Sequence, residues 1–370
     1  MRILGNLLLL SVSLILSVLA AELLARTVLD PIDYLFPQLV DDDFLFHKIE
    51  GYTGGHDAWG FRNTRTPESV DIVCIGDSMT YGISAQARDS WPAVLGKIRS
   101  TSVYNMGLGG YGPIQYLHLM RTQAVKLHPK TIIVGFYFGN DLLDVYNEVR
   151  FNEKWSGYGR LGDLDVNAPA FAFQAPPGKF LGDLRDWLSR HSVFYALLTR
   201  TSLFDFIRVR EMMQRDNGSL IMYRDDKHNE NFKLGAADRF LDMSDPRIKS
   251  AMQITKQVLR DMRSLSETDG FRLILALIPT KERVYGKLLD QAGYIAKYPR
   301  LADALHQEDV ARNTIVGFLH QSNIEFVDLL PELEEEVEKR DLYPLGDGHP
   351  NKDGYRVIAE TLDRYLNSAH

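Results

Sequence analysis

The stretch VCIGDSMTYG, Val73–Gly82, joins an apolar run to a glycine, an acidic residue and a serine. The apolar residues of 69–75 predict a buried β-strand, and the serine follows where a helix can begin. Gly-Asp-Ser is also ordinary turn chemistry, because Asp and Ser readily cap helices. Taken alone, the stretch favours a capped turn over a nucleophile, so the rest of the chain has to decide between them.

Apolar runs alternate with segments of helical periodicity over most of the chain. Strands that alternate with helices indicate a parallel sheet with helices on both faces. We therefore predict an α/β protein of three layers, α/β/α, around a central parallel sheet. Further strands are expected at 102–105, 131–138, 271–279 and 323–330, and helices at 84–100, 114–127, 245–267, 301–321 and 351–367.

The N-terminal 29 residues form the most apolar part of the chain. Arg2 precedes an apolar stretch, Ile3–Ala21, which is near the length that spans a bilayer and long for a signal-peptide core. The helical pattern continues without a breaker as far as Pro31. This favours a transmembrane anchor over a signal segment cleaved after Ala20, and over a buried core helix. Either membrane interpretation places the remainder outside the cytoplasm, in the periplasm or secreted.

The remaining chain divides into a stalk, 30–68, and a large domain, 69–370, with a helical insertion at about 145–242. Within the insertion we expect helices near 181–189, 193–198 and 203–215. The insertion is rich in aromatic residues, which would form either the floor of a sugar site or a small satellite core. These residues are Tyr146, Phe151, Trp155, Tyr158, Phe171 and Phe173.

Composition excludes several classes of protein. The chain has 370 residues, 45% of them apolar and 25% charged, which is typical of a globular protein. Its net charge is -7 and its basic residues are scattered, so no nucleic-acid surface is expected. Cys74 is the only cysteine, which excludes a disulfide framework and a cysteine-based zinc site. The glycines of 107–112 fit a dinucleotide pattern, but Pro113 follows at once. We expect no cofactor and no metal.

Short polar motifs follow the predicted strands. Gly76-Asp77-Ser78 follows the first, a glycine cluster that includes Gly110 follows the second, Gly139-Asn140-Asp141 follows the third, and GDGHPNKDGY (346–355) follows the last. Ligands of open α/β sheets bind outside the carboxyl ends of the strands. The four motifs therefore converge at one edge of the sheet.

Together these motifs contain the parts of an acyl-transfer site. Ser78 is the candidate nucleophile, His349 the base that takes its proton, and Asp347 the group that orients the imidazole. An oxyanion needs donors that are fixed in advance. Backbone N–H groups of Ser78 and Gly110 and the side-chain amide of Asn140 are suitable. Each motif is weak evidence by itself, and only their conjunction favours catalysis.

The same four blocks resemble the SGNH/GDSL hydrolase superfamily. The resemblance covers Val70–Leu366 apart from the insertion, and implies a flavodoxin-like three-layer fold and serine ester chemistry. The matching residues are Gly76-Asp77-Ser78, Gly110 five residues after Asn105, Gly139-Asn140-Asp141, and Asp347 with His349 before Pro350-Asn351.

Two departures from common patterns matter. Many members of the superfamily space the acid and base as Asp-x-x-His, whereas Asp347 and His349 are spaced Asp-x-His. This spacing and the segment IPTKERVY, Ile278–Tyr285, are similar to the branch that acts on exported polysaccharides, including alginate acetylation proteins. Gly76-x-Ser78-x-Thr80 also lacks the second glycine of the α/β-hydrolase elbow, which disfavours that neighbouring class.

The sequence thus predicts an extracytoplasmic serine ester hydrolase in which water resolves an acyl-serine. The alternative is an O-acyltransferase that passes the acyl group to a cell-surface polysaccharide, since both reactions share the first half-reaction. A catalytically silent glycan-binding protein is the third candidate. The expected partners are an acyl ester substrate and the membrane, with no nucleic acid, and the substrate and protein partners stay open.

Overall fold

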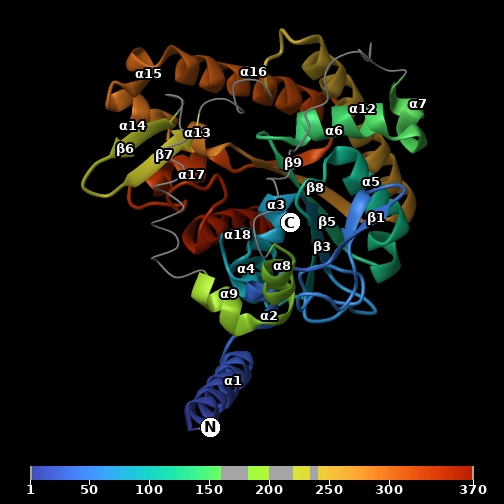
Figure 1. The fold of residues 1–370 in the computed structure, drawn as a ribbon. Helices are drawn as coiled ribbons and strands as arrows, with labels where there is room; N and C mark the ends of the chain where they lie inside the picture. The colour runs from blue at the N-terminus through green and yellow to red at the C-terminus, as the bar shows by residue number, and fades with distance from the viewer. Residues whose placement is uncertain (1, 160–181, 200–219, 234–240, 369–370) are drawn as a thin grey trace. The chain divides into compact units, whose positions relative to one another are not determined.

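The computed structural model describes residues 2–159, 182–199, 220–233 and 241–368 (Figure 1). The chain divides into two compact units. The N-terminal unit holds 1–40, 49–65 and 173–215, and the sheet unit holds 41–48, 66–172 and 216–370.

A five-stranded parallel sheet forms the centre of the sheet unit. Its spatial order is β4 (Val103–Gly107), β3 (Ile72–Gly76), β5 (Thr131–Tyr137), β8 (Arg272–Ile278) and β9 (Glu325–Asp328). In order of appearance these strands run 2-1-3-4-5, the flavodoxin-like doubly wound arrangement. All of β3 and nearly all of β5 and β8 are buried, as expected of a parallel sheet covered on both faces. The predicted fold class and the predicted strands are confirmed.

Helices cover the two faces of this sheet (Figure 1). One group packs together as α5 (Pro113–Thr122), α6 (Asp141–Phe151) and α12 (Pro246–Asp269). A second group consists of α4 (Trp91–Arg99), α17 (Leu330–Val337) and α18 (Lys352–Ser368). Helix α16 (Pro299–Gln321) contacts β9 and places Phe318 beneath two basic side chains of α12.

The core under the second group contains the inward side chains of the sheet. Cys74, Ile133 and Ile274 belong to the same buried cluster as Trp91 of α4 and Tyr355 of α18. Cys74 has no exposed surface, so it acts as a small apolar residue, as the sequence indicated.

Two predicted helices are shorter than expected. The segment 84–90 is not α-helical apart from a 3₁₀ turn at Ala87–Asp89, and α4 begins at Trp91. Pro92 fits only the first turn of a helix, because it lacks an N–H and would clash with the preceding turn further along. The helix predicted at 114–127 is α5 followed by a 3₁₀ helix, Ala124–Leu127.

The insertion is not purely helical, which corrects the prediction. Strands β6 (Leu220–Arg224) and β7 (Asn229–Lys233) form an antiparallel hairpin. Asp225 shapes its turn by accepting hydrogen bonds from the N–H groups of Lys227 and His228, both at 2.7 Å. The helices expected near 181–189 and 193–198 are present as α8 (Gly182–His191) and α9 (Val193–Thr199). The segment 203–215, Phe171 and Phe173 lie outside the described residues.

The segment predicted as an irregular stalk contains short regular elements. They are α2 (Pro31–Tyr34), β1 (Leu39–Asp42) and β2 (Phe46–Ile49), and the two strands pair with each other. Asp30 caps α2 by accepting a hydrogen bond from the N–H of Ile32 at 3.1 Å. The segment predicted as a stalk is therefore partly regular.

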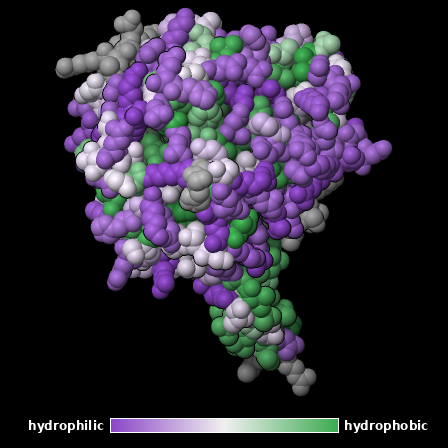
Figure 2. All heavy atoms as spheres, turned by 180° about the vertical axis from the view of Figure 1, so that it is seen from behind, coloured by the Kyte–Doolittle hydropathy of each residue, from purple (hydrophilic) through white to green (hydrophobic). Residues whose placement is uncertain are grey.

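The N-terminal unit begins with the predicted long helix, α1 (Arg2–Val28). Within it, Gly5–Val28 is long and apolar enough to cross a membrane, and none of its most apolar window is buried. Figure 2 shows the hydrophobic surface of this helix. A helix that is apolar all round and unburied is suited to lipid rather than to water.

Candidate active site

Ser78 lies on a tight turn between β3 and the short helix α3 (Ser78–Tyr81). The turn leaves no room for a side chain at two neighbouring glycines. A Cβ on Gly76 would lie 2.1 Å from Thr80 Oγ1, and a Cβ on Gly107 would lie 2.3 Å from the Tyr81 nitrogen. This close packing fixes Ser78 at the carboxyl end of the strand, where its N–H has no acceptor within the helix.

His349 contacts Ser78, and Asp347 contacts His349. The Ser78 Oγ and His349 Nε2 atoms are 2.9 Å apart, and the His349 Nδ1 and Asp347 Oδ1 atoms are 2.6 Å apart. A carboxylate only accepts, so Nδ1 carries the proton and Nε2 is free to accept the serine proton. The backbone N–H of His349 also donates to Asp347 Oδ1 at 2.9 Å. The predicted contact between Ser78 and His349 is thus present.

Ser84 is a member of this site that the sequence did not identify. Its hydroxyl donates to Asp347 Oδ2, on the carboxylate oxygen that faces away from His349. Ser84 adopts a positive φ of 68°, which is uncommon for a residue with a side chain. Burial raises the pKa of Asp347, but the hydrogen bonds from His349 and Ser84 outweigh it and hold this pKa well below its usual range. Asp347 therefore stays ionised beside the imidazole.

Asp77 is the second acceptor within reach of the Ser78 hydroxyl. Its Oδ2 lies 3.3 Å from Ser78 Oγ, and its Oδ1 accepts the N–H of Met79 at 2.8 Å. The serine has one proton, so it donates either to His349 or to Asp77, and the contact with His349 is shorter. Asp77 is fully buried, and burial raises its pKa to about 6.

The glycine loop after β4 lies beside Ser78. A Cβ on Gly109 would be 3.6 Å from Ser78 Cβ, and Gly110 has a φ of 81°, which glycine adopts at little cost. His47 of β2 holds this loop, because its Nε2–H donates to the Gly109 carbonyl at 3.1 Å. The Tyr111 hydroxyl donates in turn to the His47 carbonyl at 2.8 Å. His47 belongs to the segment predicted as a stalk, so sequence reasoning missed it.

Asn140 follows β5 and precedes α6, close to Asp77. Its side chain hydrogen bonds the Asp77 carboxylate, and this contact lowers the pKa that burial raises. A carboxylate only accepts hydrogen bonds, so the amide nitrogen of Asn140, and not its oxygen, faces Asp77. The Oδ1 atom of Asn140 is buried without a hydrogen-bond partner among the described residues. The second N–H of the amide is the group available to an oxyanion.

The third member of the Gly139-Asn140-Asp141 motif has a structural role. Asp141 is fully buried, and it accepts hydrogen bonds from the Tyr116 hydroxyl at 2.8 Å and the Tyr137 N–H at 3.0 Å. Burial raises the pKa of Asp141 well above its usual value. It joins the end of β5 to α5 and so supports the position of Asn140.

Lys281 contributes a further contact from the carboxyl end of β8. Its Nζ pairs with Glu230 Oε2 at 2.5 Å, and the two side chains are 3% and 1% exposed. The same Nζ donates to the backbone carbonyl of Asp347 at 3.2 Å. Phe232 and Tyr343 present their rings to this ammonium group, with centroids at 5.4 and 5.8 Å. The hairpin residue Glu230 thus supports the loop of Asp347 through Lys281.

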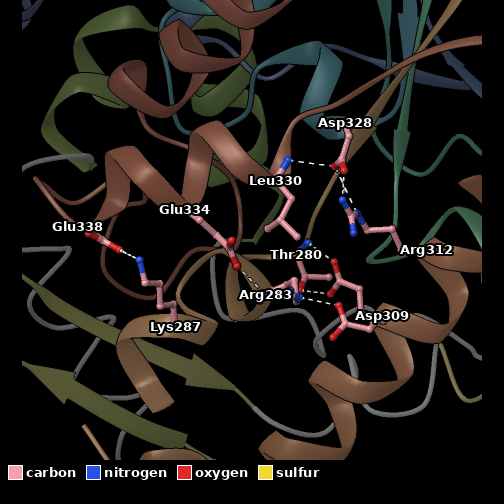
Figure 3. Close-up of polar contacts among 10 residues, drawn as sticks. Thr280, Arg283, Lys287, Asp309, Arg312, Asp328, Leu330, Glu334 and Glu338 are labelled. Atoms are coloured by element: carbon pink, nitrogen blue, oxygen red, sulfur yellow. Dashed lines mark hydrogen bonds and ion pairs between the residues drawn. The ribbon is translucent and has the colours of Figure 1, made fainter. Parts of the chain in front are cut away.

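Polar contacts on neighbouring helices hold the segment that carries Lys281 (Figure 3). Thr280 caps α13 (Lys281–Val284) by accepting the N–H of Arg283, and its own N–H donates to Glu308 at 2.9 Å. Arg283 pairs with Asp309 of α16 at 2.8 Å and with Glu334 of α17 at 2.5 Å. The segment Ile278–Tyr285 is therefore fixed from two sides.

The described residues contain no group of three or more His, Cys, Asp or Glu side chains that could hold a metal ion.

Comparison with known proteins gives fold-level likenesses of low similarity. No family model matches the chain, and no curated protein matches it. Among solved structures, it is similar to a lipolytic G-D-S-L family protein from Veillonella parvula, with 12% identity and a TM-score of 0.39 over 80% of this chain and 98% of the other. An acetylxylan esterase from Geobacillus stearothermophilus gives 12% identity and a TM-score of 0.39 over 81% and 95%. With scores in this range, function has to be argued from the geometry of the site itself.

The buried pair of Glu230 and Lys281 yields a prediction about stability. Lys281→Met should lower the free energy of unfolding by about 3–5 kcal/mol, because it leaves the Glu230 carboxylate buried and unpaired. The double variant Glu230→Met with Lys281→Met should recover most of that loss, since it leaves no buried charge. Chemical unfolding of the full chain in detergent measures both. Equal destabilisation of the single and double variants would show that the pair is not the source of the effect.

A second prediction concerns Asp77 and pH. Its pKa of about 6 in the folded protein exceeds the ordinary 3.8, so the contribution of neutral Asp77 to stability is complete below about pH 4 and is lost as pH rises through 6. Asp77→Asn removes this titration and keeps an acceptor for the N–H of Met79. The variant should therefore gain stability relative to wild type between pH 4 and 6, by roughly 3 kcal/mol at most. Thermal unfolding from pH 4 to 8 tests this, and a difference that does not change with pH would refute the assigned pKa.

Proposed function

We propose that this protein is a serine ester hydrolase of the SGNH/GDSL type, with Ser78, His349 and Asp347 as its catalytic triad. The observation that carries this proposal is the pair of contacts from Ser78 Oγ to His349 Nε2 at 2.9 Å and from His349 Nδ1 to Asp347 Oδ1 at 2.6 Å. These contacts join residues 271 positions apart in the chain at the carboxyl edge of a parallel sheet. A turn that merely capped α3 would not need a histidine and an ionised aspartate in this order.

The geometry supports a two-step reaction. Ser78 Oγ attacks the ester carbonyl carbon while His349 Nε2 takes its proton, and the ionised Asp347 stabilises the imidazolium. The carbonyl becomes an oxyanion, for which the N–H groups of Ser78 and Gly110 and the amide of Asn140 are the donors. His349 then returns the proton to the departing alkoxide, so that an alcohol leaves and an acyl-serine remains. Water, deprotonated by His349, releases the acid in the second step.

An O-acyltransferase is the alternative within the same mechanism. There a glycan hydroxyl takes the place of water in the second step, which requires no other catalytic group. The Asp-x-His spacing and the Ile278–Tyr285 segment, which resemble the polysaccharide branch, favour this alternative. Product analysis with and without a glycan acceptor distinguishes the two. A silent glycan-binding role is disfavoured by the contact between Ser78 and His349.

The proposed location is the outer side of a membrane that α1 crosses, in the periplasm or at the cell surface. The apolar surface of α1 supports this, and an acyl ester of an envelope glycan is the substrate class that such a location offers.

Active-site labelling tests the nucleophile. Wild type should react covalently with a fluorophosphonate, whereas Ser78→Ala should not react at all, because it lacks the hydroxyl that contacts the His349 base. Ser264→Ala, on the exposed side of α12, is the matched control and should react like wild type. Mass spectrometry of the labelled peptide identifies the modified residue. Labelling of Ser78→Ala at the wild-type rate would overturn the proposed mechanism.

The role of Asn140 has its own prediction. Asn140→Ala should lower kcat for a chromogenic acetyl ester by about two to three decades, equivalent to roughly 3–4 kcal/mol, because one oxyanion donor is lost. KM should change little, since the donor acts on charge that develops only in the transition state. Steady-state kinetics of purified variants give both constants. A wild-type kcat would remove Asn140 from the oxyanion site and leave the triad untouched.

A further inference from the structure

If α1 crosses a bilayer, its length fixes how deep the charged residues near its C-terminal end lie in the membrane. The stretch Ile3–Ala21 contains no charged residue. At a rise of 1.5 Å per residue it is about 28 Å long, close to the roughly 30 Å of the hydrocarbon core. Glu22 and Arg26 then come at the level of the lipid headgroups, which is where charged side chains next to a span are stable.

The junction between α8 and α9 is fixed to these two charged residues. Glu22 accepts hydrogen bonds from the N–H groups of Val193 at 3.1 Å and Phe194 at 3.0 Å, at the N-terminus of α9. It also accepts the hydroxyl of Ser192 at 2.7 Å. Arg26 pairs with Glu22 at 2.6 Å and donates to the carbonyl of His191 at 2.6 Å. The negative charge of Glu22 is stabilised by the free N–H groups at the start of α9. The end of α8 is thereby held at the depth of Glu22 and Arg26.

Helix α8 is amphipathic, but its apolar side faces outward. Leu184 and Trp187 lie one turn apart and are 50% and 56% exposed. Arg185 and Asp186 lie on a different side of the helix, and none of the residues of α8 is buried. Trp187 stacks on His191 with ring centroids 5.0 Å apart, which places the indole beside the junction with α1. A surface helix of a soluble protein normally turns such an apolar stripe toward the core.

We propose that α8 is an interfacial helix whose Leu184 and Trp187 insert into the headgroup region of the same bilayer that α1 spans. The position of α8 supports insertion into lipid, because the hydrogen bonds of Glu22 and Arg26 hold the end of this helix at the membrane surface. Side-chain chemistry supports it as well, since tryptophan prefers the interface between hydrocarbon and water. The proposal rests on the membrane-spanning role of α1 and is independent of the esterase mechanism.

The charges of α8 indicate how it recognises lipid. Asp183 and Asp186 balance Arg185 and Arg190, so the helix offers no net charge to an anionic surface. Its attachment is therefore apolar, and zwitterionic lipids should serve as well as anionic ones. Screening by salt should have little effect, in contrast to a polybasic attachment. Together with α1, this contact gives the N-terminal unit two points of attachment to one membrane.

Single-cysteine labelling in lipid nanodiscs tests the proposal on the full chain. The only native cysteine, Cys74, is completely buried, so an introduced cysteine can be labelled selectively with an environment-sensitive nitrobenzoxadiazole dye. Labels at Leu184→Cys and Trp187→Cys should shift to shorter emission wavelength and be quenched several-fold by lipids brominated near the headgroups. Labels at Arg185→Cys and Asp186→Cys are the matched controls on the opposite side of the same helix and should be quenched little. The pattern should be the same in phosphatidylcholine with or without phosphatidylglycerol, and at high salt.

A label at Leu16→Cys reports separately on α1 and should be quenched by lipids brominated deep in the acyl chains. Quenching at Leu16 without quenching at Leu184 and Trp187 would overturn the interfacial role of α8. Equal quenching at all four positions of α8 would overturn it too, because proximity alone would then explain the signal. A blue shift at Trp187 without quenching would mean that protein, for example a second copy of the chain, covers this face. No quenching at Leu16 would overturn the proposal together with its membrane premise, while fluorophosphonate labelling of Ser78 would be unaffected.

Discussion

The close approach of backbones at the end of β3 is the constraint on which the site depends. Gly76 and Gly107 have no space for a Cβ, because Thr80 and the backbone of α3 occupy it. A side chain at either position would push α3 away from the sheet, and Ser78 with it. The parallel register places Gly76 beside Gly107 on one side and beside Gly135 on the other. Three adjacent strands thus each have a glycine at the level of the sheet where Ser78 is held.

The acid and base are positioned by a different kind of interaction. Asp347 and His349 lie on a loop, and a loop has no sheet register to fix it. Hydrogen bonds to Asp347 fix this loop instead. Ser84 donates to one carboxylate oxygen of Asp347, and Lys281 donates to its backbone carbonyl. Because Glu230 pairs with Lys281 away from solvent, the inserted hairpin takes part in holding the proposed triad. The insertion therefore supports the site structurally, whatever its aromatic residues do.

The sequence predicted the features that have local signals. Buried strands show as apolar runs, and glycine, aspartate and serine mark the turn at Ser78, so the sheet and the nucleophile position followed from the chain alone. Residues that act through distant contacts gave no such signal. Ser84 and His47 are single polar residues in irregular segments, and Glu230 meets Lys281 only because β7 packs beside α13. The hairpin β6–β7 was missed within the predicted helical insertion, because strands of five residues are too short for an alternating pattern to stand out, and β7 buries three residues in a row.

Asp77 shows why a buried carboxylate persists where it lowers stability at neutral pH. Two N–H donors contact it, the backbone of Met79 and the amide of Asn140, and the oxygen of Ser78 lies 3.3 Å away. An ionised carboxylate accepts from both N–H groups and offers no proton of its own. An asparagine at this position would have to turn its NH₂ group toward the Asn140 amide or toward the Ser78 oxygen. The acceptor-only group therefore orients the Asn140 amide at the edge of the sheet. Desolvation of the Asp77 carboxylate lowers the stability of the folded protein. Its charge, in turn, keeps the donors beside Ser78 in place.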